Sequence, residues 1–224
     1  MLHLTDEYIA TLANTNGIIH VAGSPGSGKT LFAAALASSR SRTRHIDWLS
    51  TDGKIGFLVH LKNNMAYYGG IESNLTITQV ANASETKSAI LDTARRLRNN
   101  TGMVVIDSIT RVLDMSRKEK ILWGQSLFEE ALPTLAGLCM TKNLCILLIS
   151  ETRESEMGVR AVYHEKLDSW ADINLILERR SGSQVSQIYT ASADGSPREH
   201  IGNLHLSSSG GVSFSISRVS MEAS

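Results

Sequence analysis

The stretch Gly23-Ser24-Pro25-Gly26-Ser27-Gly28-Lys29-Thr30 matches the pattern G-x-x-x-x-G-K-[ST]. Before it, Ile18 to Ala22 predicts a short apolar strand, and after it Leu31 to Ala37 predicts a helix. Glycines in such a loop let successive backbone N–H groups turn toward an anion, and the start of the helix adds a partial positive charge. The order of strand, glycine-rich loop and helix therefore predicts a phosphate-binding loop, and it disfavours the alternative of a plain connection.

The end of this loop has the residues that a nucleoside triphosphate requires. The Lys29 ammonium is expected to reach the β- and γ-phosphates, and the Thr30 hydroxyl to hold Mg²⁺. ATP with Mg²⁺ is therefore the expected cofactor, with GTP left open. The residues expected to bind the nucleotide are Gly23, Ser24, Pro25, Gly26, Ser27, Gly28, Lys29, Thr30 and Leu31.

Length and composition indicate a globular protein. The chain has 224 residues, 42% of them hydrophobic and only 3 of them Pro, which predicts a single α/β domain over residues 1–224. Lys and Arg together number 22, as do Asp and Glu, so any contact with DNA has to be local. The two cysteines, Cys139 and Cys145, are too few for a four-ligand zinc site and are expected to be buried free thiols.

The sequence has no sign of a targeting or membrane segment. Residues Met1 to Glu7 lack the basic start and long apolar run of a signal peptide. The longest apolar run, Leu144 to Ile149, is far shorter than the ~20 residues of a membrane span. We therefore expect a cytoplasmic protein without a membrane partner.

A second informative stretch is Met103-Val104-Val105-Ile106-Asp107-Ser108. Its apolar residues predict a strand that is buried on both faces, and Asp107 stands at the carboxyl end of that strand. Ligands of open parallel sheets bind at this end of the strands. Asp107 is therefore expected to be the carboxylate near Mg²⁺ in a Walker B element, although an aspartate in this place can also be only a turn former.

Another predicted buried strand, Leu144 to Ile149, leads into a charged segment. Glu151 follows this strand and is expected either to orient the attacking water or to relay the state of the nucleotide, with an exposed loop glutamate as an equal alternative. Residues 151–166 lack clear periodicity and predict a mobile loop that contacts DNA or a partner. The candidate DNA-binding residues on it are Arg153, Arg160, His164 and Lys166.

The remaining elements follow from periodicity and turn residues. The C-terminal part predicts antiparallel hairpins over residues 173–217 that extend a parallel sheet. The basic run from Arg40 to Arg44 breaks the helix before it and is either a solvated turn, which we favour, or a phosphate contact. The expected strands are His45–Leu49, Leu75–Val80, Ile173–Leu177, Gln184–Thr190, Gly202–Leu206 and Val212–Ile216, and the expected helices are Ser84–Asn99 and Ile121–Asn143, the latter interrupted by Pro133.

The phosphate-binding loop, Val104-Val105-Ile106-Asp107-Ser108-Ile109-Thr110, and the strand Leu144 to Ser150 together resemble the RecA-type ATPase core. The resemblance is strongest to the short archaeal recombinase paralogues of the RadA/RadB type and covers most of the chain. It implies an α/β fold, namely a RecA-like P-loop NTPase core. In this fold a mostly parallel central sheet has helices on both faces and antiparallel strands at the C-terminal end.

The same resemblance implies a function. Such a protein binds ATP, hydrolyses it weakly and acts as a mediator or regulator of homologous recombination and DNA repair, with single-stranded DNA or a recombinase protein as partner. Ser150-Glu151 also resembles the KaiC-like branch, so a signalling ATPase that binds protein partners stays open. A nucleotide-binding scaffold without turnover stays open too, whereas a small-molecule kinase ranks last because no arginine-rich lid is evident.

The chain also departs from the recombinase pattern. An acidic residue that activates water is expected after the second strand, but Ile46-Asp47-Trp48-Leu49-Ser50 places Leu49 there, and Asp52 would have to substitute from an added loop. The basic cluster expected near the end of the chain is replaced by Thr190 to Gly195. The resemblance therefore implies slow hydrolysis and disfavours an ATP-gated filament, while self-association stays open.

Overall fold

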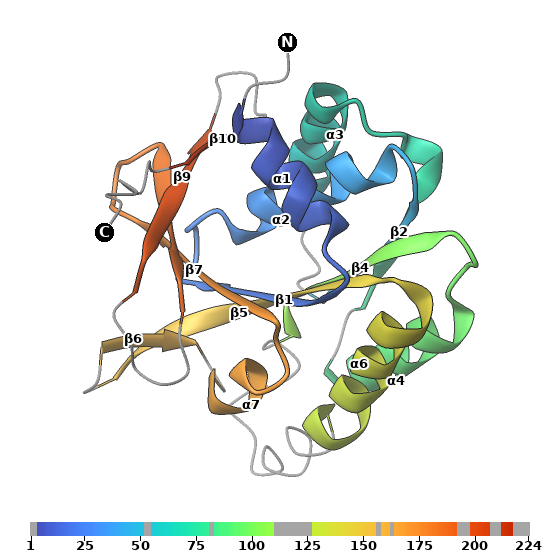
Figure 1. Ribbon diagram of the computed structural model, residues 1–224. Coiled ribbons are helices and arrows are strands. Elements are labelled where there is room, and N and C mark those ends of the chain that lie inside the picture. Colours follow the sequence, from blue (N-terminus) through green and yellow to red (C-terminus); the bar gives the residue numbers. More distant parts are fainter. Residues whose placement is uncertain are drawn as a thin grey trace, which may run out of the picture.

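A single sheet organises the fold (Figure 1). The computed structural model describes residues 4–51, 55–80, 83–109, 127–155, 158–161, 164–191, 198–206 and 212–216. Within these ranges the strand order is β10-β9-β8-β7-β1-β5-β4-β2-β3, and β6 pairs with β5. The strands are β1 Gly17–Gly23, β2 His45–Ser50, β3 Leu75–Gln79, β4 Thr101–Asp107, β5 Cys145–Ser155, β6 Gly158–Ala161, β7 Ile173–Arg179, β8 Val185–Thr190, β9 His200–Leu206 and β10 Val212–Ile216.

The type of strand pairing changes once along this sheet, from parallel to antiparallel. From β3 to β7 each neighbouring pair is parallel, and from β7 to β10 each pair is antiparallel. This arrangement confirms the predicted fold class, a mostly parallel sheet with antiparallel C-terminal strands. Parallel neighbours need crossover connections, and the helices between the strands supply them.

Helices cover both faces of the sheet (Figure 1). Three of them, α1, α2 and α3, lie on one face, and α4, α6 and α7 lie on the other. The helices are α1 Leu4–Asn14, α2 Lys29–Ser41, α3 Phe57–Tyr68, α4 Ala83–Arg96, α6 Leu132–Lys142 and α7 His164–Asp168, with the short segments η1 Glu72–Asn74 and η3 Leu127–Ala131. Pro133 stands in the first turn of α6, where its missing N–H costs no hydrogen bond, so the predicted interruption lies there.

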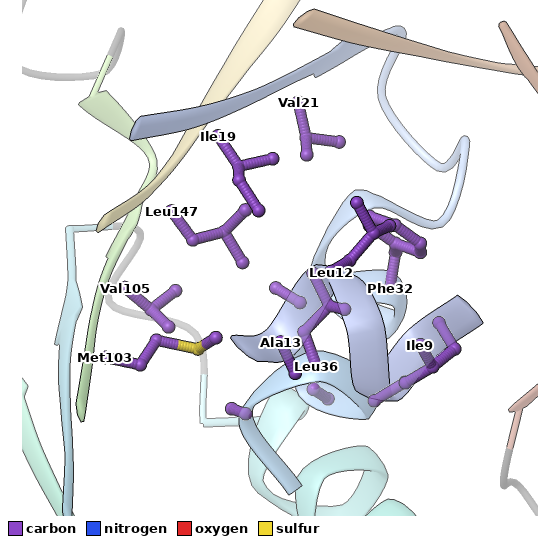
Figure 2. Packing of buried hydrophobic residues seen from close by; sticks show 14 of the residues in the cluster. Ile9, Leu12, Ala13, Ile19, Val21, Phe32, Leu36, Met103, Val105 and Leu147 are labelled. Carbon is purple, nitrogen blue, oxygen red and sulfur yellow. The ribbon is translucent and has the colours of Figure 1, made fainter. Parts of the chain in front are cut away.

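The central strands read as unbroken apolar runs because they are buried on both faces. Ile19 and Val21 of β1 pack toward α1 and α2, against Leu12 and Phe32, whereas Ile18 packs with the core beneath α4 and α6. Figure 2 shows the first of these two cores, in which side chains from β1, β4 and β5 meet those from α1 and α2. The phosphate-binding loop therefore rises from the most completely buried strand of the fold.

The described residues between Glu151 and Lys166 do not form the irregular loop that the sequence predicts over residues 151–166. Strand β5 continues to Ser155, β6 returns antiparallel to it, and α7 follows. The register pairs Thr152 with Ala161 and Arg153 with Arg160. Backbone pairing needs no apolar side chains, so these strands form although their charged sequence lacks the apolar pattern by which strands are predicted.

Candidate nucleotide-binding site

The loop between β1 and α2 needs its glycines, either because the φ angle is positive or because a side chain would clash with neighbouring atoms. Gly26 and Gly28 have φ angles of 78° and 93°, a left-handed region that strains other residues. A Cβ on Gly23 would meet Ser27 Oγ and lie 2.6 Å from the Leu177 carbonyl oxygen. A Cβ on Gly28 would lie 3.2 Å from Ser186 Oγ, so the loop rests closely on β8. The pattern of glycines therefore fits the bend and the packing of this loop.

Two polar side chains of the loop, those of Lys29 and Ser27, are suited to bind an anionic ligand. Lys29 is only 9% exposed, and its ammonium donates hydrogen bonds to the carbonyls of Gly23 and Ser24, at 2.8 and 2.9 Å. The Ser27 hydroxyl is buried and has no hydrogen-bond partner among the described residues. Buried polar atoms are normally paired, so an unpaired hydroxyl beside a lysine fits a site for phosphate oxygens.

Thr30 and Asp107 meet at the carboxyl end of the parallel strands. The Thr30 hydroxyl donates to the Asp107 carboxylate, with 2.8 Å between Oγ1 and Oδ2. Mg²⁺ at phosphate sites typically takes one or two protein ligands beside phosphate oxygens and water. Among the described residues no group of three or more His, Cys, Asp and Glu is placed to hold a metal by itself. The Thr30–Asp107 pair therefore fits Mg²⁺ bound together with a nucleotide.

Thr51 connects the end of β2 to this pair. Its N–H donates to the Asp107 carbonyl at 2.8 Å, and its hydroxyl both donates to the Ser108 carbonyl and accepts from the Ser108 N–H, at 2.8 and 2.9 Å. The end of β2 is thereby fixed beside the end of β4.

Leu49, which takes the place of the water-activating residue in the recombinase pattern, lies within strand β2 and not after it. Strand β2 runs one residue further than predicted, to Ser50, and Leu49 is a buried strand residue in register with Ile106. The first residue past the strand is Thr51, and Asp52 follows it directly in the sequence. Asp52 itself lies outside the described residues. No insertion separates it from the tethered Thr51, so it is a better candidate than the sequence alone indicates.

Glu151 lies on β5 beside the start of the phosphate-binding loop. The register pairs it with Gly23, and it is half-buried. The nearby Ala22 of β1 packs with Ala161 of β6 and Ile176 of β7. The β5–β6 hairpin therefore begins next to the loop and rests on the strand that carries it.

The sequence alone did not indicate that His20 forms a buried polar cluster close to the end of β1. His20 of β1 is 2% exposed, and its Nε2 lies 2.7 Å from Ser150 Oγ while its Nδ1 lies 3.0 Å from Asn174 Oδ1. Asp168 of α7 is 3.8 Å from Nδ1. A largely buried polar network of this kind fixes the relative positions of β1, β5, β7 and α7. The only sequence signal was a histidine within an apolar strand.

The candidate DNA-binding residues divide between two elements. Arg153 and Arg160 face each other in the register of the β5–β6 hairpin, whereas His164 and Lys166 belong to α7. Lys166 is exposed. The side chains of Arg153, Arg160 and His164 lie outside the described part of the structure.

Arg179 is a further cation beside the loop. It ends β7 and is exposed, and a Cβ on Gly26 would lie 3.4 Å from its Nη2. The guanidinium of Arg179, from a strand far along the chain, therefore lies close to the loop between β1 and α2. No motif marks Arg179, because its place depends on the pairing of β7 with β1.

The cysteines are free and buried, as predicted. Burial raises the pKa of Cys139 to about 11 and that of Cys145 to about 12. In the described ranges no helix is both long and apolar enough to cross a membrane.

Known proteins resemble this chain in sequence and in fold. The DNA repair and recombination protein RadB of Methanocaldococcus jannaschii is 22% identical over 174 residues, which cover 75% of this chain and 81% of that protein. A crystal structure of the RadB recombinase superposes with a TM-score of 0.71 at 19% identity, covering 89% of this chain and 90% of that one. This chain resembles the RadB-type, RecA-like recombinases. No protein-family profile matches the sequence. The comparison with RadB confirms the resemblance that the sequence motifs indicate.

Proposed function

We propose that this chain is a RecA-like recombination or DNA-repair protein that binds ATP with Mg²⁺, hydrolyses it slowly and acts as a mediator or regulator. The observation that carries the proposal is the hydrogen bond between Thr30 and Asp107 beside the buried Lys29. The likeness to a RadB protein of DNA repair and recombination and to a RadB recombinase supports the recombination and repair part of the proposal. We propose that one domain over residues 1–224 carries this function in the cytoplasm.

The residues of the site have separate roles in this proposal. Lys29 exchanges its bonds to the loop carbonyls for the β- and γ-phosphates, and the backbone N–H groups from Gly23 to Leu31 surround the phosphates. Arg179 adds positive charge from the side of β7. Thr30 and Asp107 hold Mg²⁺, which when bound neutralises charge that develops on the phosphate oxygens.

Two carboxylates are proposed to act on the attacking water. Asp52 follows the tethered Thr51 and serves as the base, whereas Glu151 orients the water or senses the nucleotide from β5. An aspartate is shorter than the glutamate of the recombinase pattern. Slow hydrolysis is the expected consequence.

Single-stranded DNA is proposed to bind the β5–β6 hairpin through Arg153 and Arg160, with His164 and Lys166 on the adjoining α7. The strand β5 runs without a break from Glu151, beside Gly23, to Arg153. A change at the nucleotide is thereby transmitted along one strand to the DNA contact. A recombinase protein is the alternative partner of the same hairpin. The missing basic cluster after Thr190 disfavours an ATP-gated filament, and self-association stays open.

A KaiC-like signalling ATPase is the second candidate, because Glu151 lies beside the phosphate-binding loop. In that case protein partners replace DNA on the hairpin. A nucleotide-binding scaffold without turnover is the third.

ATP turnover with and without single-stranded DNA separates these candidates, with Lys29→Ala as control. The proposal expects slow turnover that DNA stimulates and that disappears in the Lys29 variant. Stimulation should also be lost in Arg153→Gln with Arg160→Gln, but kept in Lys62→Gln with Arg180→Gln, which removes the same charge from exposed positions elsewhere. Turnover without stimulation would instead favour the signalling ATPase, and binding without turnover the scaffold.

A further inference from the structure

Arginines from two distant parts of the sequence gather where strands β2 and β4 begin. One group lies in the turn between α2 and β2, and the other at the end of α4 and in the connection to β4. The residues, which we call the arginine rim, are Arg42, Arg44, Arg95, Arg96 and Arg98.

Hydrogen bonds hold the two groups together. Arg44 donates from Nε to the Asn100 carbonyl and from Nη2 to the Thr101 carbonyl, at 3.0 and 2.8 Å. The Arg98 guanidinium lies 3.5 Å from Thr76 Oγ1, and the same hydroxyl is 3.1 Å from His45 Nε2. The turn before β2 and the connection before β4 thus form one surface.

The charge of this surface is exposed and only partly balanced. Arg42, Arg95, Arg96 and Arg98 are all exposed, and the Arg95 side chain is 76% exposed. The carboxylates on β2, on η1 and in the second half of α4 are Asp47, Glu72 and Asp92, whereas Glu85 and Asp107 stand at the opposite ends of α4 and β4. Asp47 accepts a bond from Thr101 Oγ1 at 3.0 Å, and Asp92 lies 3.6 Å from Arg95. A positive surplus therefore remains here, although the whole chain has no net charge.

The stabilising effect of cations at a helix C-terminus explains only some of the arginines in the arginine rim. Arg95 and Arg96 stand in the last turn of α4, where cations are stabilising. Arg42 and Arg98 lie outside the regular helices and point to a further role. Thr43, Asn99 and Asn100 between them are exposed and polar, which differs from the apolar centre of a protein interface. Arginine, threonine and asparagine side chains are common donors to nucleic-acid phosphates.

We propose that the arginine rim binds the phosphate backbone of a nucleic-acid strand. This contact is additional to the β5–β6 hairpin and goes beyond the proposed function. The rim lies where the parallel strands begin, whereas the nucleotide site lies where they end. Binding at the rim is therefore independent of ATP.

The test is equilibrium binding of a labelled oligo-dT to the full chain across salt concentrations, without nucleotide and with ATP·Mg²⁺. The variant Arg42→Gln with Arg96→Gln removes one charge from each group and spares the structural Arg44. Since each phosphate contact contributes ~0.7 to the salt slope of single-strand binding, the slope should fall by about 1.4 and affinity at about 0.1 M salt by roughly tenfold. Lys62→Gln with Arg180→Gln removes equal charge elsewhere and should bind like wild type.

Several results would overturn the proposal. Unchanged binding in the rim variant, or an equal loss in the control variant, would show that the rim makes no specific contact. A loss of binding to poly-glutamate with no loss for oligo-dT would assign the rim to an acidic protein. The hairpin variant Arg153→Gln with Arg160→Gln is measured alongside. If the hairpin variant binds like wild type while the rim variant does not, the proposed hairpin contact fails while the rim stands. Thermal melts that match wild type exclude misfolding.

Discussion

The Thr30 hydroxyl donates a hydrogen bond to the Asp107 carboxylate across 2.8 Å, although 77 residues separate them in the chain. Thr30 lies in the first turn of α2 and Asp107 ends β4, so the contact exists only because β1 and β4 both border β5. The bond joins the hydroxyl expected to hold Mg²⁺ to the carboxylate expected near the same ion. It is the geometric basis of the proposed ATP site.

Replacing Asp107 with Asn should weaken the dependence of ATP binding on Mg²⁺. The amide keeps the shape but lacks the charge, and losing a partner of a metal site typically costs about 10–100-fold. Calorimetric titration should show at least a tenfold loss of ATP affinity with Mg²⁺ and little change in EDTA. Asp92→Asn on α4 is the matched control. An unaltered Mg²⁺ response in the Asp107 variant would remove this residue from the site.

Arg179→Ala should lower the affinity for ATP. Its guanidinium lies close to Gly26 of the loop, and we expect it to bond a phosphate oxygen of the bound nucleotide. A hydrogen bond to a charged group contributes roughly 1.5–3 kcal/mol, which corresponds to about tenfold or more. The neighbouring Arg180→Ala, also exposed, should bind ATP like wild type. Equal affinities for the two variants in the same titration would contradict a role for Arg179.

Asp52→Asn should reduce turnover without reducing ATP affinity. A general base typically contributes about 10²–10⁴-fold to rate, so a fall of at least a hundredfold is expected. Glu151→Gln should also slow turnover, because Glu151 lies beside Gly23. Single-turnover hydrolysis measures both, with Glu72→Gln on η1 as control. Full activity in Asp52→Asn would show that a group other than Asp52 is the general base.

The two thiols should resist alkylation in the folded protein at pH 8. Burial raises the pKa values of Cys139 and Cys145 to about 11 and about 12, so the reactive thiolate is scarce. In the unfolded chain the two thiols ionise near pH 9, before they do so in the folded protein. Each thiol therefore contributes stability that is present below pH 9 and is lost as the pH rises toward 11–12. Timed labelling in buffer and in denaturant checks this. Rapid labelling of the native protein would show that the thiols are accessible.

Several parts of the fold follow from local sequence. The loop from Gly23 to Thr30 is recognisable because its glycines, Lys29 and Thr30 have a fixed spacing. Strand β4 is recognisable because its apolar run ends in a single acidic residue, Asp107. The C-terminal strands are separated by turn residues and lie close to their predicted bounds. Each of these features is determined by residues that are neighbours in the chain.

Other parts depend on contacts between distant residues. The end of β2 is fixed by Thr51 bonding to the Asp107–Ser108 segment, and no local pattern separates Leu49 inside the strand from Thr51 outside it. Arg179 reaches Gly26 only through the pairing of β7 with β1. The arginine rim likewise needs the pairing of β2 with β4 to bring its two groups together.

The most direct test of the central claim is the affinity for ATP·Mg²⁺ of wild type and Lys29→Ala, measured by calorimetry on the full chain. Lys29 is buried at the loop, where its ammonium is placed to pair with phosphates. We predict one ATP per wild-type chain and at least a tenfold loss in the variant, with matching melting temperatures showing that both are folded. No ATP binding by wild type, or equal binding by both proteins, would contradict the assignment of this loop as an ATP site.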